Sequence, residues 1–438
     1  MSNELATTKP LDQEGRHALV REFSLEIMEG VDRGARFRST RERAVVGTHA
    51  SADLILRDPA VSRFHCELVL EGNRVLLRDL GSRNGTTIDG VPVQVAYLQR
   101  PATIAIGESA LRFELGPEKV RVALSGRERF GRLVGRSPAM RACFALLESA
   151  ARSDVTVLLQ GETGTGKDAA AEGIHQEGAR GGGPFVVVDC GALPPHLIGD
   201  ELFGHERGAF TGAIGAREGA FEAAHGGTLF LDEVGELTAD LQPQLLRAVE
   251  SHTVRRLGGN QTVSIDVRII AATNRDLKAE VNAHRFRSDL YFRLGVLEVR
   301  LPPLRDRLDD IPLVVDELLR SLDLADHPSG RALLEPAATA ALRSHAWPGN
   351  IRELRNHVER CVALDLADSP AASSGAEPPA LDTSLPIRKA RERWVRWFER
   401  QYLARLLDES GGNVTAAARS AGVDRIHMHR LLAKVGLR

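Results

Sequence analysis

The chain has 438 residues, a hydrophobic content of 43% and a formal net charge of −2. This length suits three domains, and this hydrophobic content supports sizeable cores. The amino-terminal region has no transmembrane run and no signal-like apolar core, which argues against a membrane anchor or secretion signal there and indicates a cytoplasmic protein. The 4 Cys and 14 His residues show no metal-ligand spacing, so we expect buried thiols in a reducing compartment.

Residues 21–118, which follow an N-terminal tail at 1–20, show short alternating strand patterns separated by turns. Such a pattern predicts a β-sandwich, and it lacks the alternating strand–helix units and strand-end acids of a receiver domain. The clearest strand segments are 24–28, 52–56, 66–70 and 75–77.

Several short motifs lie in the turns of this predicted sandwich. They are SRFH at 62–65 and DLGSRNGT at 79–86, with Val46-Gly47, Asp58 and Asp89-Gly90. The set resembles the forkhead-associated (FHA) domain, a reader of phosphothreonine peptides. The resemblance implies that Ser62 and Arg63 contact the phosphate and that His65 braces the loop internally. It also implies that Arg83 and Asn84 contact the peptide near the phosphate.

One position departs from the FHA pattern. An Arg normally follows the first Gly of the motif and donates a charge-assisted pair to the phosphate, but Thr48 stands there. A hydroxyl donates a hydrogen bond without charge, for which Arg63 and Arg83 can compensate. Phosphothreonine binding, by which the domain would engage a phosphorylated protein or a Ser/Thr kinase, therefore competes with a phosphate-independent docking or self-inhibiting role.

After a linker at 119–132, the sequence GETGTGK at 161–167 follows the apolar run 155–159 and precedes the helix-compatible run 169–174. This strand–loop–helix setting predicts a nucleotide site in which backbone N–H groups cradle phosphates and Lys167 reaches the outer two. Asp168 stands where a Ser or Thr hydroxyl would meet magnesium, so the metal must use other oxygens. The predicted nucleotide contacts are Gly161, Glu162, Thr163, Gly164, Thr165, Gly166, Lys167 and Asp168.

Such oxygens end the buried strand in GGTLFLDE at 226–233. We expect Asp232 to hold magnesium and Glu233 to orient or deprotonate the water that attacks the terminal phosphate of ATP. A further strand, 267–272, leads to Asn274, whose amide suits sensing of the phosphate or its water. Taken alone, adjacent acids at a strand end are also compatible with a solvated turn, and Asn is a common turn residue.

Between these motifs lies GAFTGA at 208–213, where two glycines and small residues carry a single aromatic, Phe210. Glycine permits backbone angles that other residues resist, so such a loop is able to move. Taken alone, the composition is typical of an ordinary surface turn. Its position between a phosphate loop and an acidic strand end favours a functional role.

Together these motifs make the segment from about 133 to 363 similar to the AAA+ domain of bacterial sigma-54-dependent transcriptional activators. The motifs are completed by FRSDLYFRL at 286–294 and WPGNIREL at 347–354. The resemblance implies an α/β ATPase core at 133–303, a helical lid at 304–365, and a loop that contacts the sigma factor. That contact loop comprises Gly208, Ala209, Phe210, Thr211, Gly212 and Ala213.

The same resemblance implies that Arg287 and Arg293 enter the nucleotide site of a neighbouring subunit as arginine fingers. A permanently charged guanidinium stabilises charge on the transferred phosphoryl group. It also implies that Arg352 reaches the bound nucleotide from the lid. Fingers that act on a neighbour require a ring-closing interface, so we expect a homo-oligomer that ranges from dimer to hexamer. Without the family, paired arginines of this kind are typical surface charges.

Two positions depart from the family pattern. The family usually has Glu after the phosphate-loop Lys, where this chain has Asp168. It also usually has Asn before the Cys of the FVxVNC strand, where this chain has Asp189. That Asn interacts with the catalytic Glu in the family, whereas an acid would repel Glu233 unless one of them were protonated or a cation intervened. The coupling of hydrolysis to partner binding is therefore expected to be retuned.

After a predicted flexible linker at 366–384, residues 385–438 show a capped short helix, a glycine turn and a second helix. This all-α outline resembles the Fis-type helix-turn-helix domain of these activators. Residues 388–438 hold 12 Lys/Arg against 5 Asp/Glu, a net charge of +7, which favours double-stranded DNA. We expect Met428, Leu431, Leu432 and Val435 to form its buried side. The candidate DNA contacts, each of which also suits a solvated face, are Arg425, His427, His429, Arg430 and Lys434.

The sequence thus predicts a multidomain activator with a β-sandwich, an α/β ATPase with helical lid, and a DNA-binding tail. It would bind DNA upstream of promoters, use ATP and magnesium, and remodel the sigma-54 RNA polymerase holoenzyme under phosphothreonine control. Two alternatives remain. One is an AAA+ remodeller of another protein, and the other is a phosphopeptide-regulated DNA-binding scaffold with an inactive ATPase.

Overall fold

A computed structural model describes residues 17–39, 43–71, 74–210 and 215–364, together with Leu403, Val414, Ala418, Ala421, Met428 and Leu432. The chain divides into two compact units. The first contains residues up to 327 and residues 346–360, and it holds both the sandwich and the central α/β domain. The second contains residues 328–345 and those from 361 onward. Each unit is described separately below.

Two sheets form the N-terminal sandwich, with the strand orders β2-β1-β11-β10-β7-β8 and β4-β3-β5-β6-β9. Their pairs are antiparallel, except that β3 and β4 run parallel. Alternate residues such as Ala102, Ile104 and Ile106 in β10 are buried, as the period of a strand requires. The strands are β1 (His17–Glu29), β2 (Arg36–Arg38), β3 (Arg43–Gly47), β4 (Leu54–Ile55), β5 (Cys66–Glu71), β6 (Arg74–Asp79), β7 (Thr86–Ile88), β8 (Val91–Val93), β9 (Val95–Leu98), β10 (Ala102–Ile106) and β11 (Ser109–Ala123).

Apolar side chains from both sheets meet in one core, which includes Leu25, Val46, Leu68, Ile104 and Phe113. The expected segment 52–56 shortens to Leu54–Ile55, because the residues before it form a turn closed by a hydrogen bond from Ala52 N to His49 O. The predicted β-sandwich is otherwise confirmed.

The central domain is built on a five-stranded parallel sheet with the order β15-β18-β21-β14-β22. Its strands are β14 (Val157–Gln160), β15 (Phe185–Asp189), β18 (Thr228–Asp232), β21 (Arg268–Thr273) and β22 (Leu297–Arg300). Leu158 and Leu231 enter an apolar cluster on one face of the sheet, whereas Leu159 and Phe230 enter a cluster on the other. Both faces are therefore covered, which explains the uninterrupted apolar runs in the sequence.

The chain also forms helices. In the first unit they are α1 (Pro138–Ala151), α2 (Lys167–Gln176), α3 (Pro195–Phe203), α4 (Ala220–Ala223), α5 (Gln242–Ser251), α6 (Leu277–Asn282), α7 (Ser288–Leu294) and α8 (Ile311–Ser321), with short 3-10 turns at Val234–Glu236, Leu304–Asp306 and Leu308–Asp310. Local sequence sets their starts: Ser137 caps α1 by accepting from Met140 N, and Asp276 caps α6 by accepting from Lys278 N and Ala279 N.

Short two-stranded ribbons complete the first unit. They are β12 (Arg129–Phe130) with β13 (Leu133–Val134), β16 (Gly204–His205) with β17 (Arg217–Glu218), and β19 (Thr253–Arg255) with β20 (Thr262–Ser264). Helix α11 (Asn350–Ala363) begins in the first unit. The second unit contains α9 (Pro328–Ala332) and α10 (Pro336–Ser344).

Most of the predicted helix-turn-helix lies outside the described residues, but its six described positions bear on the prediction. Met428 and Leu432 are helical and fully buried, as expected for the inner side of the second helix. Val414 and Ala418 are also helical and buried, and their spacing of four is that of one helix face. The buried-face prediction is therefore confirmed for Met428 and Leu432, and Leu431 and Val435 lie outside the described residues.

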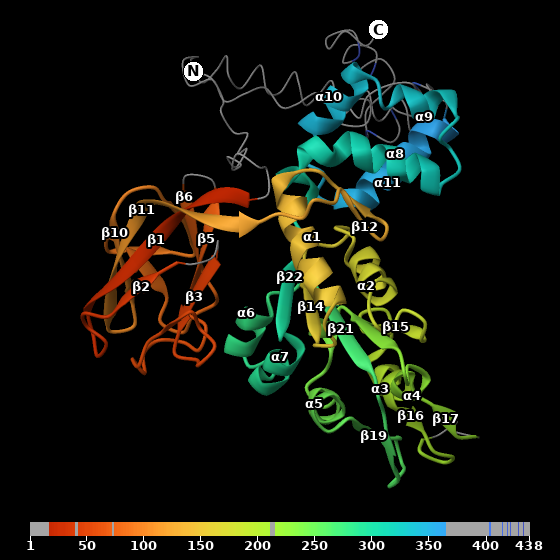
Figure 1. The fold of residues 1–438 in the computed structure, drawn as a ribbon, viewed down its shortest axis with the longest axis horizontal. Coiled ribbons are helices and arrows are strands. Elements are labelled where there is room, and N and C mark those ends of the chain that lie inside the picture. The colour runs from red at the N-terminus through yellow and green to blue at the C-terminus, as the bar shows by residue number, and fades with distance from the viewer. Residues whose placement is uncertain are drawn as a thin grey trace. The chain divides into compact units, whose positions relative to one another are not determined.

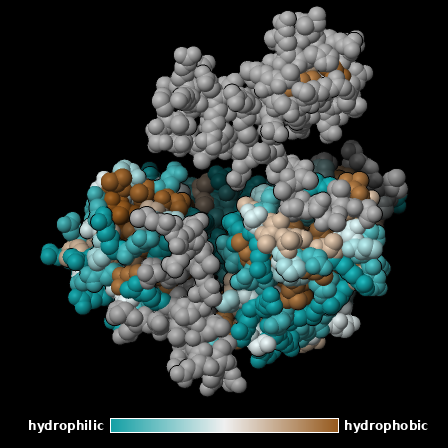
Figure 2. All heavy atoms as spheres, turned by 90° about the horizontal axis from the view of Figure 1, so that it is seen from above, coloured by the Kyte–Doolittle hydropathy of each residue, from teal (hydrophilic) through white to brown (hydrophobic). Residues whose placement is uncertain are grey.

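Among the coloured residues on the face shown in Figure 2, most are hydrophilic, and the apolar ones form separate small patches. In the described part of the chain, none of the helices combines the length and the hydrophobicity needed to cross a membrane. All four cysteines are buried and none forms a disulfide, so the prediction of buried thiols is confirmed.

Candidate nucleotide-binding site

The loop Gly161–Lys167 joins β14 to α2 at the carboxyl edge of the parallel sheet. Gly164 and Gly166 have φ angles of 79° and 99°, which glycine adopts without steric cost. The buried ammonium of Lys167 donates to Gly161 O (3.0 Å), so the loop is folded back around its own lysine. Backbone N–H groups at the start of α2 are thereby arranged as an anion cradle.

Glu233 lies next to this lysine, because β18 ends beside the loop. Its Oε1 is 3.4 Å from Lys167 Nζ, and its Oε2 accepts a hydrogen bond from Asn274 N (2.9 Å). Asn274 in turn donates from Nδ2 to Thr163 Oγ1 in the phosphate loop (3.1 Å). Three residues predicted from separate motifs, Lys167, Glu233 and Asn274, are therefore brought together by the order of the parallel strands.

Asp232 is half-buried at the last position of β18. Burial, followed by the charge of Glu233, raises the pKa of Asp232 above its usual range, while Lys167 opposes the shift. Asp232 Oδ1 accepts from Glu233 N (3.0 Å). Within the described part of the chain, Oδ2 has no protein hydrogen-bond partner, so a carboxylate oxygen is available there for a hard cation. Asp168, by contrast, is exposed in the first turn of α2.

Asp189 is paired with Asp232 in the parallel register of β15 and β18. Its Oδ1 accepts hydrogen bonds from Gly191 N (2.8 Å) and Ala192 N (3.1 Å), which turns the carboxylate into the following loop. These two hydrogen bonds reduce the electrostatic repulsion between Asp189 and Glu233 that we expected from the sequence. The Asp189 charge still adds, less than burial and Glu233 do, to the raised pKa of Asp232.

Two side chains that hold the phosphate loop from outside, Asn350 and Arg305, were not predicted from the sequence. The fully buried Asn350 donates from Nδ2 to Glu162 Oε2 and Thr163 O, both at 3.1 Å, and accepts from Leu304 N at 2.8 Å. Arg305 forms a two-pronged pair with Glu162, at 2.8 and 2.6 Å. This pair and the Asn350 hydrogen bond lower the pKa of the Glu162 carboxyl to about 2. Asn350 lies in the GNIREL motif, from which we predicted a role for Arg352 alone.

Arg352 itself is exposed on the first turn of α11, next to the phosphate loop. Ile351 N donates to Gly164 O (2.9 Å), and a Cβ atom placed on Gly164 would lie 3.0 Å from Arg352 Cβ. The fully buried Arg307 also supports the loop by donating to Thr165 O (3.1 Å). Arg352 thus lies where a side chain can reach a bound nucleotide, and its role stays a prediction.

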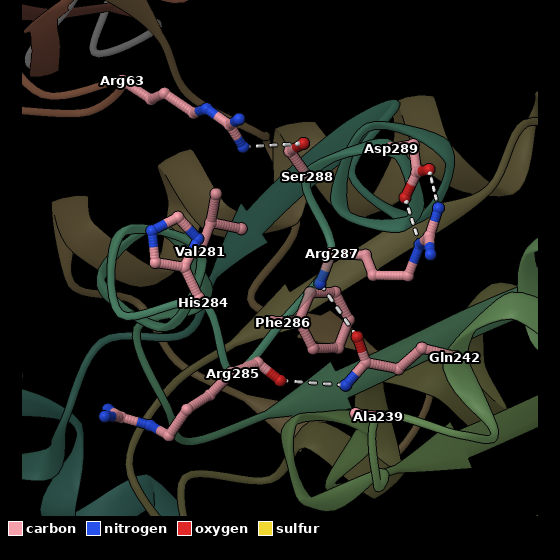
Figure 3. Close-up of a pocket in the computed structure, with 10 residues that line it drawn as sticks. All are labelled: Arg63, Ala239, Gln242, Val281, His284, Arg285, Phe286, Arg287, Ser288 and Asp289. Atoms are coloured by element: carbon pink, nitrogen blue, oxygen red, sulfur yellow. Dashed lines mark hydrogen bonds and ion pairs between the residues drawn. The ribbon is translucent and has the colours of Figure 1, made fainter.

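The two predicted finger residues lie at the start and in the last turn of α7. Arg287 pairs with Asp289 through two hydrogen bonds (3.0 and 2.7 Å), and its N–H donates to Gln242 Oε1 (2.8 Å), as Figure 3 shows. Arg293 pairs with Glu250 (2.8 Å). Both guanidinium groups are about half exposed, so neither is buried in the interior of its own domain.

The described part of the GAFTGA loop ends at Phe210, and Thr211, Gly212 and Ala213 lie outside the described residues. Phe210 is 44% exposed, and its ring meets His205 edge-on with centroids 5.0 Å apart. Gly208 has a φ angle of 84°. The loop therefore presents an aromatic side chain at the surface, as the sequence predicted for Phe210.

In the sandwich, the predicted phosphopeptide residues lie on neighbouring loops. Ser62 Oγ accepts from Arg83 N (3.0 Å), and Thr48 N donates to Ser62 O (3.1 Å). Asn84 donates from Nδ2 to Ala60 O (2.7 Å). The loops carrying Thr48, Ser62 and Arg83 are therefore adjacent.

His65 is fully buried between these loops. Its Nδ1 accepts from Ser62 N (3.2 Å) and its Nε2 lies 3.0 Å from Gly85 O, so a neutral ring protonated at Nε2 satisfies both. Burial lowers the pKa of His65, which agrees with a neutral ring. The candidate DNA contacts Arg425, His427, His429, Arg430 and Lys434 lie outside the described residues.

Comparison with known proteins agrees with this arrangement. Residues 133–300 match the family described as Sigma-54 interaction domain, and residues 305–374 match an AAA+ ATPase lid domain. Residues 26–116 match the family described as Inner membrane component of T3SS, cytoplasmic domain.

Among curated proteins, the chain is 45% identical over 306 residues to Transcriptional regulatory protein GlrR of Escherichia coli (strain K12), which is 69% of this chain and 67% of that protein. It is 44% identical over 310 residues to Transcriptional regulatory protein ZraR of the same strain, covering 70% and 68%. The crystal structure of NtrX from Brucella abortus in complex with ADP is 34% identical, covers 69% of this chain and 70% of that one, and has a TM-score of 0.50. This chain belongs to the family of sigma-54-dependent transcriptional activators, and its central domain is an AAA+ ATPase.

Proposed function

We propose that this protein uses ATP hydrolysis to remodel the closed complex of the sigma-54 RNA polymerase holoenzyme. The observation that carries the proposal is the position of Glu233 between Lys167 Nζ (3.4 Å) and Asn274 N (2.9 Å) at the phosphate loop. This holds the carboxylate at the edge where a terminal phosphate and its attacking water would lie. It is the geometry required of a general base or a water-orienting group.

The residues present also fit magnesium. Asp232 has a carboxylate oxygen without a protein partner in the described chain, and carboxylate oxygens are preferred ligands of this cation. Magnesium would neutralise charge on the outer phosphates. Lys167 would bind those phosphates, and Asn274 would hold Glu233 toward the water.

The proposed output is the GAFTGA loop, whose exposed Phe210 would contact the sigma factor. The proposed arginine fingers Arg287 and Arg293 would act in a neighbouring subunit of a ring. Their half-exposed guanidinium groups support this assignment, since each would exchange an internal carboxylate for a phosphate. The C-terminal residues 385–438 would bind DNA upstream of the promoter.

The sandwich would sense the regulatory signal by binding a phosphorylated peptide. Ser62, Arg63 and Arg83 on adjacent loops suit a phosphothreonine peptide, from a phosphorylated protein or a Ser/Thr kinase. Thr48 supplies no charge, so this site would rely on its two arginines.

Two substitutions test the proposal. Glu233→Gln should retain nucleotide binding and lose turnover by roughly 10² or more, the usual contribution of a general base. Thr211→Ala should hydrolyse ATP normally while losing open-complex formation with sigma-54 polymerase. Full transcription by Thr211→Ala would reject the loop assignment and favour a remodeller of another protein. Absence of magnesium-dependent ATP turnover in the parent, even when concentrated, would favour a DNA-binding scaffold.

A further inference from the structure

The loops of the sandwich that carry the proposed phosphate site contact the central ATPase domain within the first unit. Arg63 donates from Nη1 to Ser288 Oγ (3.2 Å), at the first residue of α7. Figure 3 shows the two side chains directed toward each other. Both line a cavity of about 220 Å³ that Arg287 also borders. A residue assigned to phosphate recognition is therefore engaged by an unphosphorylated serine beside a proposed arginine finger.

An aromatic contact lies next to this hydrogen bond. Phe64 is fully buried and belongs to the apolar cluster of the ATPase domain, not to the core of the sandwich. Its ring centroid lies 5.6 Å from that of Tyr291 and 6.0 Å from that of Phe292. His49 stacks on Phe292 at 4.2 Å with an interplanar angle of 15°. The sandwich thus inserts one aromatic side chain into the ATPase domain and covers α7 with another ring.

Asn282, the last residue of α6, makes the contact specific. Its Nδ2 donates to Phe64 O and to Leu80 O (2.9 Å for the latter), so one amide bridges the two sandwich loops that carry Ser62 and Arg83, the recognition loops. Leu80 is itself buried in the same apolar cluster as Phe64. Neither carbonyl is in a regular strand, so each would otherwise need water.

A charged contact extends the interface beyond the loops. Arg43 of β3 lies 3.9 Å from Glu298 of β22, and it also pairs with the buried Glu67 of the sandwich. Charges of opposite sign therefore meet across the two domains where both are largely removed from water.

We infer that the recognition face of the sandwich is a docking surface for α6 and α7 of the ATPase domain of the same chain, and that docking excludes a ring neighbour from α7. The second half of this inference rests on the proposed function, which places Arg287 and Arg293 at a subunit interface. A neighbour that approached Arg287 would meet the sandwich, because Arg63 already contacts the adjacent residue, Ser288. Release of the sandwich exposes the face of α7 on which His49 and Phe64 lie.

The same contacts explain how a signal reaches the ATPase. Arg63 gives Nη1 to Ser288 in the docked state, so a phosphate that takes a two-pronged pair from this guanidinium competes with docking for the side chain. The docked sandwich then blocks α7, and binding of a phosphopeptide to the sandwich releases it from the ATPase domain.

Two substitutions break the contact without altering the nucleotide site. Asn282→Ala removes the bridging amide, and Phe64→Ser removes the inserted ring. Val91→Ser is the control, because Val91 is a 61% exposed apolar residue on β8 of the same sandwich. The full-length proteins are compared by amide hydrogen exchange of 282–294 and by the protein concentration that gives half-maximal ATPase activity and assembly with magnesium and ATP.

Both contact variants are expected to exchange these amides roughly tenfold faster than the parent and to assemble at a concentration lower by roughly fivefold or more. The control should match the parent in both measurements. Unchanged exchange would overturn the docking surface, and faster exchange with unchanged assembly would overturn the exclusion of a neighbour. If the variants exchange faster while neither they nor the parent assemble at any concentration, the docking surface stands and the ring of the proposed function fails.

Discussion

Asn274 joins Glu233 to the phosphate loop. Its backbone N–H donates to Glu233 Oε2 (2.9 Å), and its side-chain amide donates to Thr163 Oγ1 (3.1 Å). One residue at the end of β21 therefore links the proposed water-orienting acid to the loop that holds the nucleotide. A change in loop position on binding or hydrolysis would be transmitted to the acid through this residue.

Substituting Asn274 tests this link. Asn274→Ala keeps the backbone donor to Glu233 and removes the side-chain bond to Thr163, so ATP should still bind. The ATP turnover number should fall by roughly tenfold, the value of about one hydrogen bond. Steady-state hydrolysis and equilibrium binding of a nucleotide analogue separate the two effects. Equal turnover in Asn274→Ala and the parent would contradict the link.

Asn350 supports the loop from α11. Asn350→Ala should lower the free energy of unfolding by about 2–4 kcal/mol, because Leu304 N and Thr163 O lose their partner in a buried position and the residue has a φ angle of 53°. Nucleotide binding should weaken as well.

Asn350→Gly separates the two causes, since glycine accepts the backbone angle but makes no side-chain hydrogen bond. Chemical denaturation measures both variants. If Asn350→Gly were as stable as the parent, the hydrogen bonds of Asn350 would have no structural importance.

Gly164 leaves no room for a side chain. A Cβ atom there would lie 2.4 Å from Gly349 O, and the φ angle of 79° already disfavours other residues. Gly164→Ala should therefore displace the start of α11 from the phosphate loop and weaken ATP binding. Gly182→Ala is the matched control, because no atom lies within 4 Å of its added Cβ. Titration with ATP should distinguish the two variants, and equal affinities would refute the steric argument.

His65 should make the sandwich sensitive to mild acid. Burial lowers its pKa below the ordinary 6.5, so the folded protein resists a proton that the unfolded chain binds. The stability that the neutral ring contributes is present above pH 6.5 and is lost as the pH falls through the folded pKa. The slope from this one residue is at most about 1.4 kcal/mol per pH unit.

His65→Asn removes this titration. The variant should be less stable than the parent at pH 7.5, because the neutral ring joins Ser62 N to Gly85 O. Its stability should fall less steeply between pH 6.5 and 5, as followed by denaturation of the full-length protein. His49 and His175, whose pKa values burial also lowers, titrate in both proteins and cancel in the comparison. Parallel pH profiles would contradict the assignment to His65.

Local sequence patterns predicted the strands of the sandwich and of the α/β domain, and they also predicted Lys167, Glu233 and Asn274, which the structure brings together. The strand–loop–helix of GETGTGK, the apolar run before Asp232 and the paired motifs of the sandwich each depend on residues close together in the chain. Their geometry follows from strand periodicity and from the backbone freedom of glycine, which can be read from neighbouring residues. The confirmed sandwich and α/β domain show how much such short-range rules determine.

Only the tertiary structure placed Asn350 and Arg305 beside Glu162, turned Asp189 into its own loop, and set Phe64 against Tyr291. These contacts join residues as much as 227 positions apart, and nothing in a local pattern states which buried surface an asparagine or a phenylalanine will meet. The strand order, with β21 between β18 and β14, brought Asn274 to Glu233 and to the loop. Packing of the sandwich against α6 and α7 decided that Arg63, predicted to contact a phosphate, lies beside Ser288, and that Asn282 bonds to Leu80 O.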